Sequence, residues 1–244
     1  MQVLISIDDT DDLESPGTGE LASEIARMIE MRGWGKTSFV TRHQLLIHPD
    51  IPYTSHNSAM CFPAMLEPGC REIVISAAAD FLKRQSAPGS DPGLCVAALP
   101  SDSTLVDFGL AAKRSVLTKN DAYGLAKRLR IHLSEHGGSG QGVVGALAGA
   151  GLRLGGNDGR MRGTLPLPRA ADRISVADLL AFEHVDAVET RDGQALPDDA
   201  TVRVFGDKIK TVMIGGRSVL LVTSDPQGGE GTWRNFSPRE LKSY

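Results

Sequence analysis

Four aspartates follow a short apolar segment near the start of the chain, and this juxtaposition constrains the fold more than any other feature of the sequence. Val3–Ile7 is apolar and β-branched, which predicts a buried strand, and it leads directly into the acidic run Asp8-Asp9-Thr10-Asp11-Asp12. Carboxylates at the end of a buried strand, just before a helix, form the arrangement in which α/β proteins place phosphate and metal sites. We therefore expect the N-terminal part to carry such a site.

The segment after the acidic run predicts a glycine turn and a helix. Glu14-Ser15-Pro16-Gly17-Thr18-Gly19 contains two glycines that can adopt positive φ, and Thr18 or Ser15 is expected to cap the helix. Apolar residues then recur at helical spacing before Gly33, at Leu21, Ile25, Met28 and Ile29. Backbone N–H groups near Gly17–Gly19 are expected to cradle an anion.

The acidic run itself predicts a metal site. Four carboxylates within five residues repel one another, and a hard cation such as Mg²⁺ relieves the repulsion, with substrate phosphates completing its coordination. Alternate side chains of an extended segment share a face, so Asp9 and Asp11 are expected to converge while Asp8 faces elsewhere. The alternative interpretation is a solvated turn, or an acidic first helical turn that the helix dipole favours.

Composition is that of an ordinary globular protein. The 244 residues are 41% hydrophobic, which suffices for one large core or two smaller ones. The net charge of −4 argues against coating of duplex nucleic acid by charge alone, and 5% aromatic residues argue against a stacking platform for single strands. Cys61, Cys70 and Cys95 contain no Cys-x-x-Cys pair, so neither a disulfide framework nor a zinc ribbon is expected. The N-terminus lacks signal-peptide features and Gly142–Leu152 is too short to cross a membrane, so we expect a cytoplasmic protein without a membrane partner.

The rest of the chain alternates strand and helix patterns before a β-rich end. Strands are expected at 37–42, 45–48, 59–62, 72–76 and 94–99, and helices at 77–85, 103–116 and 120–135. After the Gly-rich segment 137–159, short strands are expected at 185–189, 201–205, 211–214 and 218–223, with Gly215-Gly216 suited to a tight hairpin. These patterns predict an α+β fold in three parts: 1–66, a ferredoxin-like 67–170, and a small β-rich unit, 171–244, joined near Arg169–Ile174.

Further motifs give weaker indications. His132-Leu133-Ser134-Glu135-His136 has the spacing of a zinc motif that would place both imidazoles on one helix face, but Gly137-Gly138 ends that helix at once. Gly140-Gln141-Gly142-Val143-Val144-Gly145 matches the dinucleotide-binding pattern in letters but follows a helix, so we expect bare N–H groups that bind an anion, or close helix packing. Asn57 is either an amide ligand for a phosphate or base, or a turn former. Three arginines could bring guanidinium groups to a phosphate: Arg153, Arg160 and Arg162.

Three segments together resemble the archaeal synthetases that form agmatidine on a cytidine of an isoleucine tRNA. They are Ile7-Asp8-Asp9-Thr10-Asp11 with Gly17-Thr18, the segment from Ile51-Pro52-Tyr53 to Asn57-Ser58-Ala59, and Gly142-Val143-Val144-Gly145-Ala146-Leu147-Ala148. The resemblance covers roughly residues 1–155, and its specific part is the Asp-Asp-Thr-Asp run. It implies a kinase-like ATP-binding domain in 1–66 and a ferredoxin-like domain after it. In the family, phosphate from ATP activates the cytosine carbonyl oxygen and agmatine then displaces it.

The resemblance also implies roles for individual residues. Asp8, Asp9 and Asp11 hold Mg²⁺ with ATP, and Thr18 accepts or binds phosphate. The residues expected to act in catalysis are Asp9, Asp11 and Thr18. Those expected to bind the nucleotide are Asp8, Gly17, Gly19, Asn57, Gly142 and Gly145. The sequence has no cysteine pair for the family's zinc ribbon, so we expect neither that ribbon nor an extension of the length of its OB fold, and the family's paired threonines correspond to a single one in Gly17-Thr18-Gly19.

We therefore expect a Mg²⁺- and ATP-dependent enzyme that transfers phosphate to an oxygen nucleophile, as a kinase or as the first half of a ligation. The expected partners are a nucleotide and an unidentified small-molecule or nucleoside acceptor; tRNA stays open as a partner, but tRNA alone is not expected to be the acceptor. Two alternatives stay open. One is a module that binds a nucleotide or anion without turnover. The other is a metal-dependent phosphohydrolase that uses Asp9 and Asp11.

Overall fold

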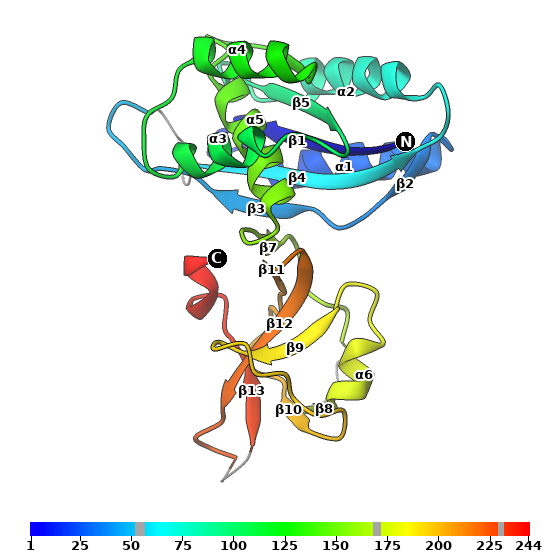
Figure 1. Cartoon of the computed structure of the whole chain (residues 1–244), viewed down its shortest axis with the longest axis vertical. Coiled ribbons are helices and arrows are strands. Elements are labelled where there is room, and N and C mark those ends of the chain that lie inside the picture. Colours follow the sequence, from blue (N-terminus) through cyan, green and yellow to red (C-terminus); the bar gives the residue numbers. More distant parts are fainter. Residues whose placement is uncertain (52–56, 168–171, 229–231) are drawn as a thin grey trace. The chain divides into compact units, whose positions relative to one another are not determined.

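The computed structural model describes residues 1–51, 57–167, 172–228 and 232–244, and the chain divides into two compact units, Met1–Gly155 and Gly156–Tyr244 (Figure 1). The join expected near Arg169–Ile174 lies partly outside the described residues. The residues of the expected first and second parts share one sheet within the first unit. Their assignment as kinase-like and ferredoxin-like parts, and the division at 66 and 170, stay predictions.

The first unit is built on an antiparallel sheet with the N-terminal strand at its centre. Along the sheet the order is β6-β5-β1-β4-β3, and β2 also pairs with β4. The strands are β1 (Gln2–Asp8), β2 (Gly35–Thr37), β3 (Thr41–Gln44), β4 (Ser58–Leu66), β5 (Gly93–Ala98) and β6 (His132–Glu135). Because Ser6 pairs with Cys61 on one side and Cys95 on the other, β1 is hydrogen-bonded along both edges. Its end, where the acidic run begins, is therefore fixed by two neighbouring strands.

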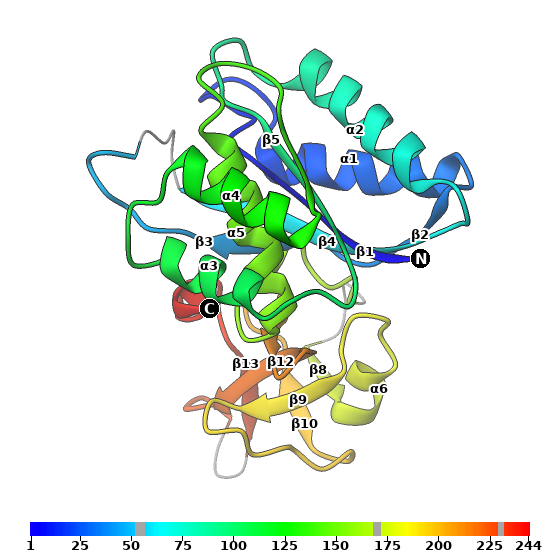
Figure 2. The same cartoon turned by 45° about the horizontal axis from the view of Figure 1, so that its top comes forward.

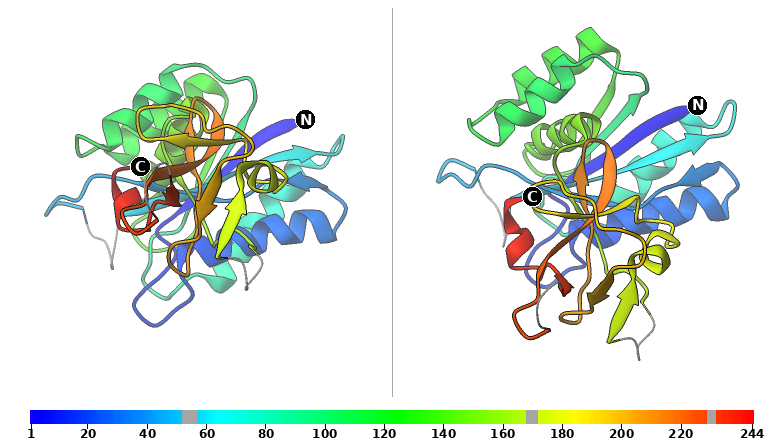
Figure 3. Two further views of the ribbon diagram at one scale, coloured as in Figure 1. Left: turned by 90° about the horizontal axis from the view of Figure 1, so that it is seen from below. Right: turned by 60° about the horizontal axis from the view of Figure 1, so that its bottom comes forward.

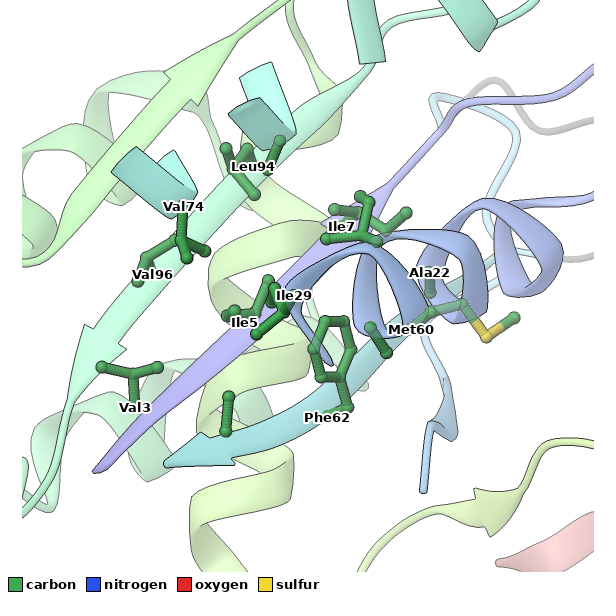
Figure 4. Close-up of a cluster of buried hydrophobic side chains, with 14 of the residues drawn as sticks. Val3, Ile5, Ile7, Ala22, Ile29, Met60, Phe62, Val74, Leu94 and Val96 are labelled. Atoms are coloured by element: carbon green, nitrogen blue, oxygen red, sulfur yellow. The ribbon is translucent and has the colours of Figure 1, made fainter. Parts of the chain in front are cut away.

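Helices cover both faces of this sheet (Figure 2). They are α1 (Thr18–Met31), α2 (Arg71–Gln85), α3 (Thr104–Ala112), α4 (Lys119–Leu129) and α5 (Gly142–Gly155). The odd side chains of β1 pack with α1 and α2, and Figure 4 shows Val3, Ile5 and Ile7 among this core. Leu4, on the other face, packs with α3, α4 and α5. The period of two along the strand thus makes β1 a part of both cores.

The even side chains of β1 run along α5. An ideal Cβ on Gly149 would lie 2.6 Å from Ser6 Oγ, and one on Gly145 would lie 1.7 Å from Asp8 Oδ2. Glycines four residues apart on a helix lie on the same face, so Gly145 and Gly149 let the helix backbone approach Asp8 and Ser6. This close approach brings the start of α5 to the acidic end of β1.

Several expected elements of the first unit are confirmed, and three are wrong. The strands near 3–7, 59–62 and 94–99 and the helix after the glycine turn are present. Residues 72–76 are helical, within α2, because Val74, Ile75, Ala78 and Leu82 bury one helix face despite their local β-branched character. The helix expected over 120–135 ends at Leu129, where Arg130 has a left-handed φ of 55°, and His132–Glu135 instead form the edge strand β6. The structure has no strand at 45–48.

The second unit is mostly β-structure, drawn from yellow-green to red in Figure 3. It contains β7 (Arg160–Met161), β8 (Arg173–Ser175), α6 (Val176–Leu180), β9 (Ala187–Thr190), β10 (Thr201–Arg203), β11 (Val212–Ile214), β12 (Arg217–Ser224), β13 (Trp233–Asn235) and a short 3-10 helix, Glu240–Ser243. The strand order is β7-β11-β12-β13-β10-β8, with β9 parallel to β12. The expected hairpin is confirmed: Ile214 pairs with Arg217 across Gly215-Gly216, whose φ values are 59° and 76°.

The mixture of helices and strands confirms the expected fold class in its coarse form. Among the described residues, every helix falls short of the length and apolar character that crossing a lipid bilayer requires.

Candidate functional site

A cavity of about 520 Å³ in the first unit collects most of the residues expected from the sequence to form a site. The expected residues that line it are Asp8, Asp9, Asp11, Thr18, Asn57, Gly142 and Gly145. They come from the end of β1, the start of α1, the residue before β4 and the first turn of α5. Gly17 and Gly19 do not line the cavity: Gly17 is the residue before α1, and Gly19 is buried inside its first turn.

A chain of hydrogen bonds joins the acidic run to the start of α1. The Thr18 hydroxyl donates to Asp11 Oδ1 at 2.8 Å, and the Thr10 hydroxyl donates to Thr18 Oγ1 at 3.1 Å. The expectation that Thr18 or Ser15 caps α1 is wrong, because no side chain caps this helix and the Ser15 hydroxyl accepts from Asp12 N–H. The Thr18 oxygen therefore lies beside a carboxylate that can receive its proton.

The start of α1 also has unused hydrogen-bond donors. Gly17 is extended, and its carbonyl accepts from Glu20 N–H at 2.7 Å. Within the described residues, the N–H groups of Thr18 and Gly19 have no protein acceptor. Free N–H groups at the positive end of a helix are a suitable place for an anion.

Asp9 is unusual in both its backbone conformation and the pKa of its carboxyl. Asp9 has a φ of 52°, a left-handed conformation uncommon for a residue with a side chain. Partial burial, followed by the negative charges of Asp91 and Asp11, raises its pKa to about 6. A cation bound nearby would favour its ionised form.

Asp8 lies deeper than Asp9. It is 8% exposed, and burial, together with the negative charge of Asp9, raises the pKa of its carboxyl well above the ordinary value. Asp8 lies against Gly145 of α5, whereas Asp11 contacts Thr18 of α1. The expectation that Asp9 and Asp11 converge while Asp8 faces elsewhere stays a prediction, because all three residues line one cavity and the charge of Asp11 adds to the raised pKa of Asp8.

These carboxylates suit Mg²⁺ if the ion binds together with a phosphate. In the described part of the chain, no group of three or more histidine, cysteine or acidic side chains is arranged to hold a metal by itself. Mg²⁺ is usually held by one or two carboxylates, with waters and substrate phosphates as its other ligands. Asp9 and Asp11 line the same cavity and suit this role, and the raised pKa of Asp9 reflects its partial burial first and then repulsion from Asp91 and Asp11, which a cation would relieve.

The start of α5 is not the bare anion site expected from its glycines. The N–H of Gly142 donates to the Asp91 carbonyl at 3.1 Å, and that of Val144 donates to Gln141 O at 3.0 Å. A Cβ on Gly142 would lie 2.0 Å from the Asp91 carbonyl oxygen. Gly142 and Gly145 therefore serve the close packing of α5 against the sheet, which is the alternative interpretation of this segment.

Sequence reasoning missed a second polar wall of the cavity. Asp91 Oδ1 accepts from Ser139 N–H at 2.5 Å, and this bond holds the loop before α5. Lys119 Nζ donates to Ser139 O at 2.6 Å and to Glu135 Oε2 at 2.5 Å. Lys119, Ser139 and Gln141 all line the cavity. No local pattern marks these residues, because tertiary packing alone brings them together.

A third wall is apolar. Its side chains are Leu45, Ile51, Ala112, Val116 and Leu117. Asn57 lies beside this wall, and its amide donates to Leu46 O at 2.7 Å. This bond joins residues eleven apart in sequence, so it is not the local bond of a turn former; Asn57 lies at the cavity, and its role as an amide ligand stays a prediction. The adjoining residues of the resemblance, 52–56, lie outside the described residues.

The remaining motifs lie away from the cavity. His132 and His136 lie on β6 and beyond its end, not on a helix, and each Nε2 lies 2.9 Å from Ser134 Oγ. The Arg153 guanidinium lies 4.7 Å from the centre of the Phe39 ring, and Arg160 donates to Pro238 O at 3.3 Å. None of these residues lines the cavity, nor does Arg162.

Comparison with solved structures identifies similar folds. A tRNA fluorescent labeling enzyme has 26% sequence identity and a TM-score of 0.56, over 62% of this chain and 36% of its own. Apo TiaS, an agmatidine synthetase that acts on an isoleucine tRNA, has 24% identity and a TM-score of 0.52, over 62% and 35% of the two chains. TiaS in complex with that tRNA and ATP has 22% identity and a TM-score of 0.58, over 82% and 50%.

The resemblance to agmatidine synthetases expected from the sequence is confirmed, because TiaS and the labeling enzyme are structural neighbours of this chain. The matches span between about a third and half of the neighbours' own lengths. No protein-family model and no curated protein sequence matches the chain. The similarity establishes a shared fold.

Proposed function

We propose that this chain is a Mg²⁺- and ATP-dependent enzyme that transfers a phosphoryl group to an oxygen nucleophile, as a complete reaction or as the first half of a ligation. The observation that carries the proposal is the hydrogen bond from Thr18 to Asp11 at the wall of a cavity that also contains Asp9. It pairs a hydroxyl nucleophile with a base next to carboxylates that suit a metal.

The acidic residues and the start of α1 have different roles in the proposed reaction. Asp9 and Asp11, with Asp8 behind them, would hold Mg²⁺, which supplies neutralisation of phosphate charge when it is bound. The free N–H groups of Thr18 and Gly19 would receive a phosphate oxygen at the start of α1. Because the direction of these N–H groups is fixed, they would stabilise the negative charge that develops on the phosphoryl oxygens during transfer.

Thr18 is the proposed transient acceptor. Its Oγ forms a bond to the terminal phosphorus as the bond from that phosphorus to the bridging oxygen of ADP breaks, and the hydroxyl proton passes to Asp11 Oδ1. A second nucleophile then takes the phosphoryl group from Thr18. If the acceptor instead reacts directly with ATP, the Thr18 hydroxyl and Asp11 orient it.

The neighbours support a nucleotide as one ligand. One of them is crystallised with its isoleucine tRNA and ATP, and a further TiaS structure, 22% identical with a TM-score of 0.57, contains AMPCPP and agmatine. We propose that the acceptor in this protein is an oxygen of a small molecule or nucleoside. A tRNA is the second substrate to test, because the acidic chain of net charge −4 gives no general attraction for RNA.

Calorimetric titration with Mg²⁺ and ATP tests the proposal. Wild-type protein is expected to bind, and Asp9→Asn is expected to weaken binding by about 10- to 100-fold, since a charged ligand group is lost. Asp12→Asn is the matched control: it removes a charge from the same acidic run, but Asp12 is outside the cavity, and its Oδ1 can still accept from Glu14 and Ser15. Equal affinities of wild type and Asp9→Asn would contradict the proposal.

Turnover separates the proposed enzyme from its alternatives. Binding of ATP without release of ADP in the presence of small-molecule, nucleoside and tRNA acceptors would identify a binding module. Hydrolysis of p-nitrophenyl phosphate that is lost in both Asp9→Asn and Asp11→Asn would identify a phosphohydrolase.

A further inference from the structure

The cavity needs a fixed cation as well as a metal if a polyphosphate is to enter it. Four of its lining residues are acidic: Asp8, Asp9, Asp11 and Asp50. A nucleoside triphosphate is itself strongly anionic, so carboxylates at this density would repel it unless positive charge is also present. Among the described residues that line the cavity, Lys119 is the single cationic one.

The Lys119 ammonium is fixed in place with a donor to spare. Its Nζ donates to Glu135 Oε2 at 2.5 Å and to Ser139 O at 2.6 Å. An ammonium group has three N–H donors, so these two bonds leave one. The side chain is 27% exposed and lines the cavity. Because two bonds already orient it, little side-chain entropy is lost when the third donor meets a ligand.

The main chain around Lys119 supports this position. Thr118 and Asp121 form a complete capping box, so the start of α4 and the Lys119 backbone are ordered without a ligand. On the other side, Asp91 Oδ1 holds Ser139 N–H at 2.5 Å, so the carbonyl that Lys119 contacts is fixed as well. The segment 115–119 lines the cavity without a break, from Val116 and Leu117 in the apolar wall to Lys119.

We propose that Lys119 contacts the polyphosphate chain of the nucleotide and that the apolar wall next to it receives the uncharged part of the ligand. This inference rests on the proposed function of the same cavity. Lys119 would be the cation that stays with the protein, while Mg²⁺ arrives with the phosphates. Glu135 and Ser139 would act as positioning groups, because they orient the Lys119 ammonium and would not themselves contact the reacting atoms.

Substitution of Lys119 tests the inference through the difference between charged and uncharged ligands. Lys119→Met is expected to weaken binding of Mg²⁺-ATP by about tenfold or more, and to leave binding of adenosine unchanged. Lys119→Arg is expected to retain part of the affinity for Mg²⁺-ATP. Lys127→Met, which removes a charge from the exposed last turn of α4, is the matched control and is expected to bind both ligands like wild type.

Each outcome has a distinct meaning. If Lys119→Met and wild type bind Mg²⁺-ATP equally well, the inference is wrong while the proposed function survives. If Lys119→Met weakens adenosine as much as Mg²⁺-ATP, Lys119 has a structural role and the inference is also wrong. If wild type binds inorganic triphosphate in a Lys119-dependent way but not ATP, the polyphosphate subsite is supported and the proposed nucleotide chemistry fails.

Discussion

Gly145 lies so close to Asp8 that a single added carbon at this position would overlap the carboxylate: an ideal Cβ would be 1.7 Å from Asp8 Oδ2. Asp8 is 8% exposed at the end of the central strand and cannot move into solvent without disturbing β1. The helix backbone and the carboxylate therefore fix each other's position at the floor of the cavity.

Gly145→Ala is expected to displace Asp8 and to weaken binding of Mg²⁺-ATP, and to lower the free energy of unfolding by about 1–3 kcal/mol, as overpacking does. Gly124→Ala is the control, since Gly124 is an exposed position of α4 with nothing within 4 Å of its added Cβ. That variant is expected to be more stable by about 0.5–1 kcal/mol because alanine loses less entropy in a helix. Denaturant unfolding measures both. A Gly145→Ala protein as stable as Gly124→Ala would contradict this close packing.

The raised pKa of Asp9 predicts how stability depends on pH. The folded state holds this carboxyl's proton up to a pKa of about 6, above the ordinary value of 3.8 in the unfolded chain. Because the folded state binds this proton more tightly than the unfolded chain does, protonated Asp9 raises the free energy of unfolding at low pH. This contribution is lost as the pH rises from about 4 through about 6. Asp9→Asn is expected to be more stable than wild type at about pH 8 and to lose that advantage towards about pH 4.

Thermal unfolding of wild type and Asp9→Asn across this pH range tests the expectation, with Asp12→Asn as the control from the same run. A pH-independent difference between wild type and Asp9→Asn would mean that Asp9 does not titrate in this range. Added Mg²⁺ and ATP should shift the wild-type curve upwards most strongly above about pH 6, where Asp9 is ionised.

The Thr18 hydroxyl predicts a covalent intermediate. Incubation with Mg²⁺ and ATP is expected to add one phosphoryl group to the wild-type protein, on the peptide that contains Thr18. Thr18→Val, which keeps the side-chain shape but has no hydroxyl, is expected to remain unmodified, and Thr18→Ser is expected to retain modification. Mass spectrometry of proteolytic peptides locates the group. Phosphate on Thr10 in place of Thr18 would contradict the assignment, since Thr10 only donates to Thr18 Oγ1.

In the second unit, Arg203 and Asp225 predict a separate acid sensitivity. Arg203 donates from Nη2 to Asp225 Oδ1 at 2.8 Å and from Nε to Oδ2 at 2.5 Å, and this pairing lowers the pKa of Asp225 to about 2. The stabilisation is present above the ordinary pKa of 3.8 and is lost as the pH falls through about 2.

Arg203→Met is expected to lower the unfolding temperature at neutral pH much more than Arg217→Met. Both pairs bury their carboxylate, but the Arg217 side chain is 50% exposed against 19% for Arg203, and it donates one hydrogen bond where Arg203 donates two. The difference between Arg203→Met and wild type should narrow near pH 2. Equal effects of the two arginine substitutions at neutral pH would mean that the second hydrogen bond and the greater burial of Arg203 add nothing to its pair.

Local pattern was sufficient where sequence neighbours decide the structure. The strand 3–7, the acidic run and the glycine turn before α1 were predictable, because apolar periodicity and turn chemistry act over a few residues. The pattern failed at 72–76, where burial of one face of α2 overrode β-branched composition. It also failed at Arg130, which ends a helix in a left-handed conformation that no glycine marks. Lys119 and Ser139 could not be placed at the cavity from sequence, nor Asp91 beside Ser139, because the packing of α4, β6 and α5 decides their proximity.

The alternation of β1 has a consequence for how this protein can change. Odd positions anchor the layer of α1 and α2, and the even ones step along α5 to Asp8. Deleting or inserting one residue within 3–7 would exchange the two faces of the strand, so that Asp8 would point into the hydrophobic core and Ile7 towards the cavity. Single substitutions in this segment are therefore compatible with the site, whereas insertions and deletions are not, because the length of the segment determines where Asp8 lies.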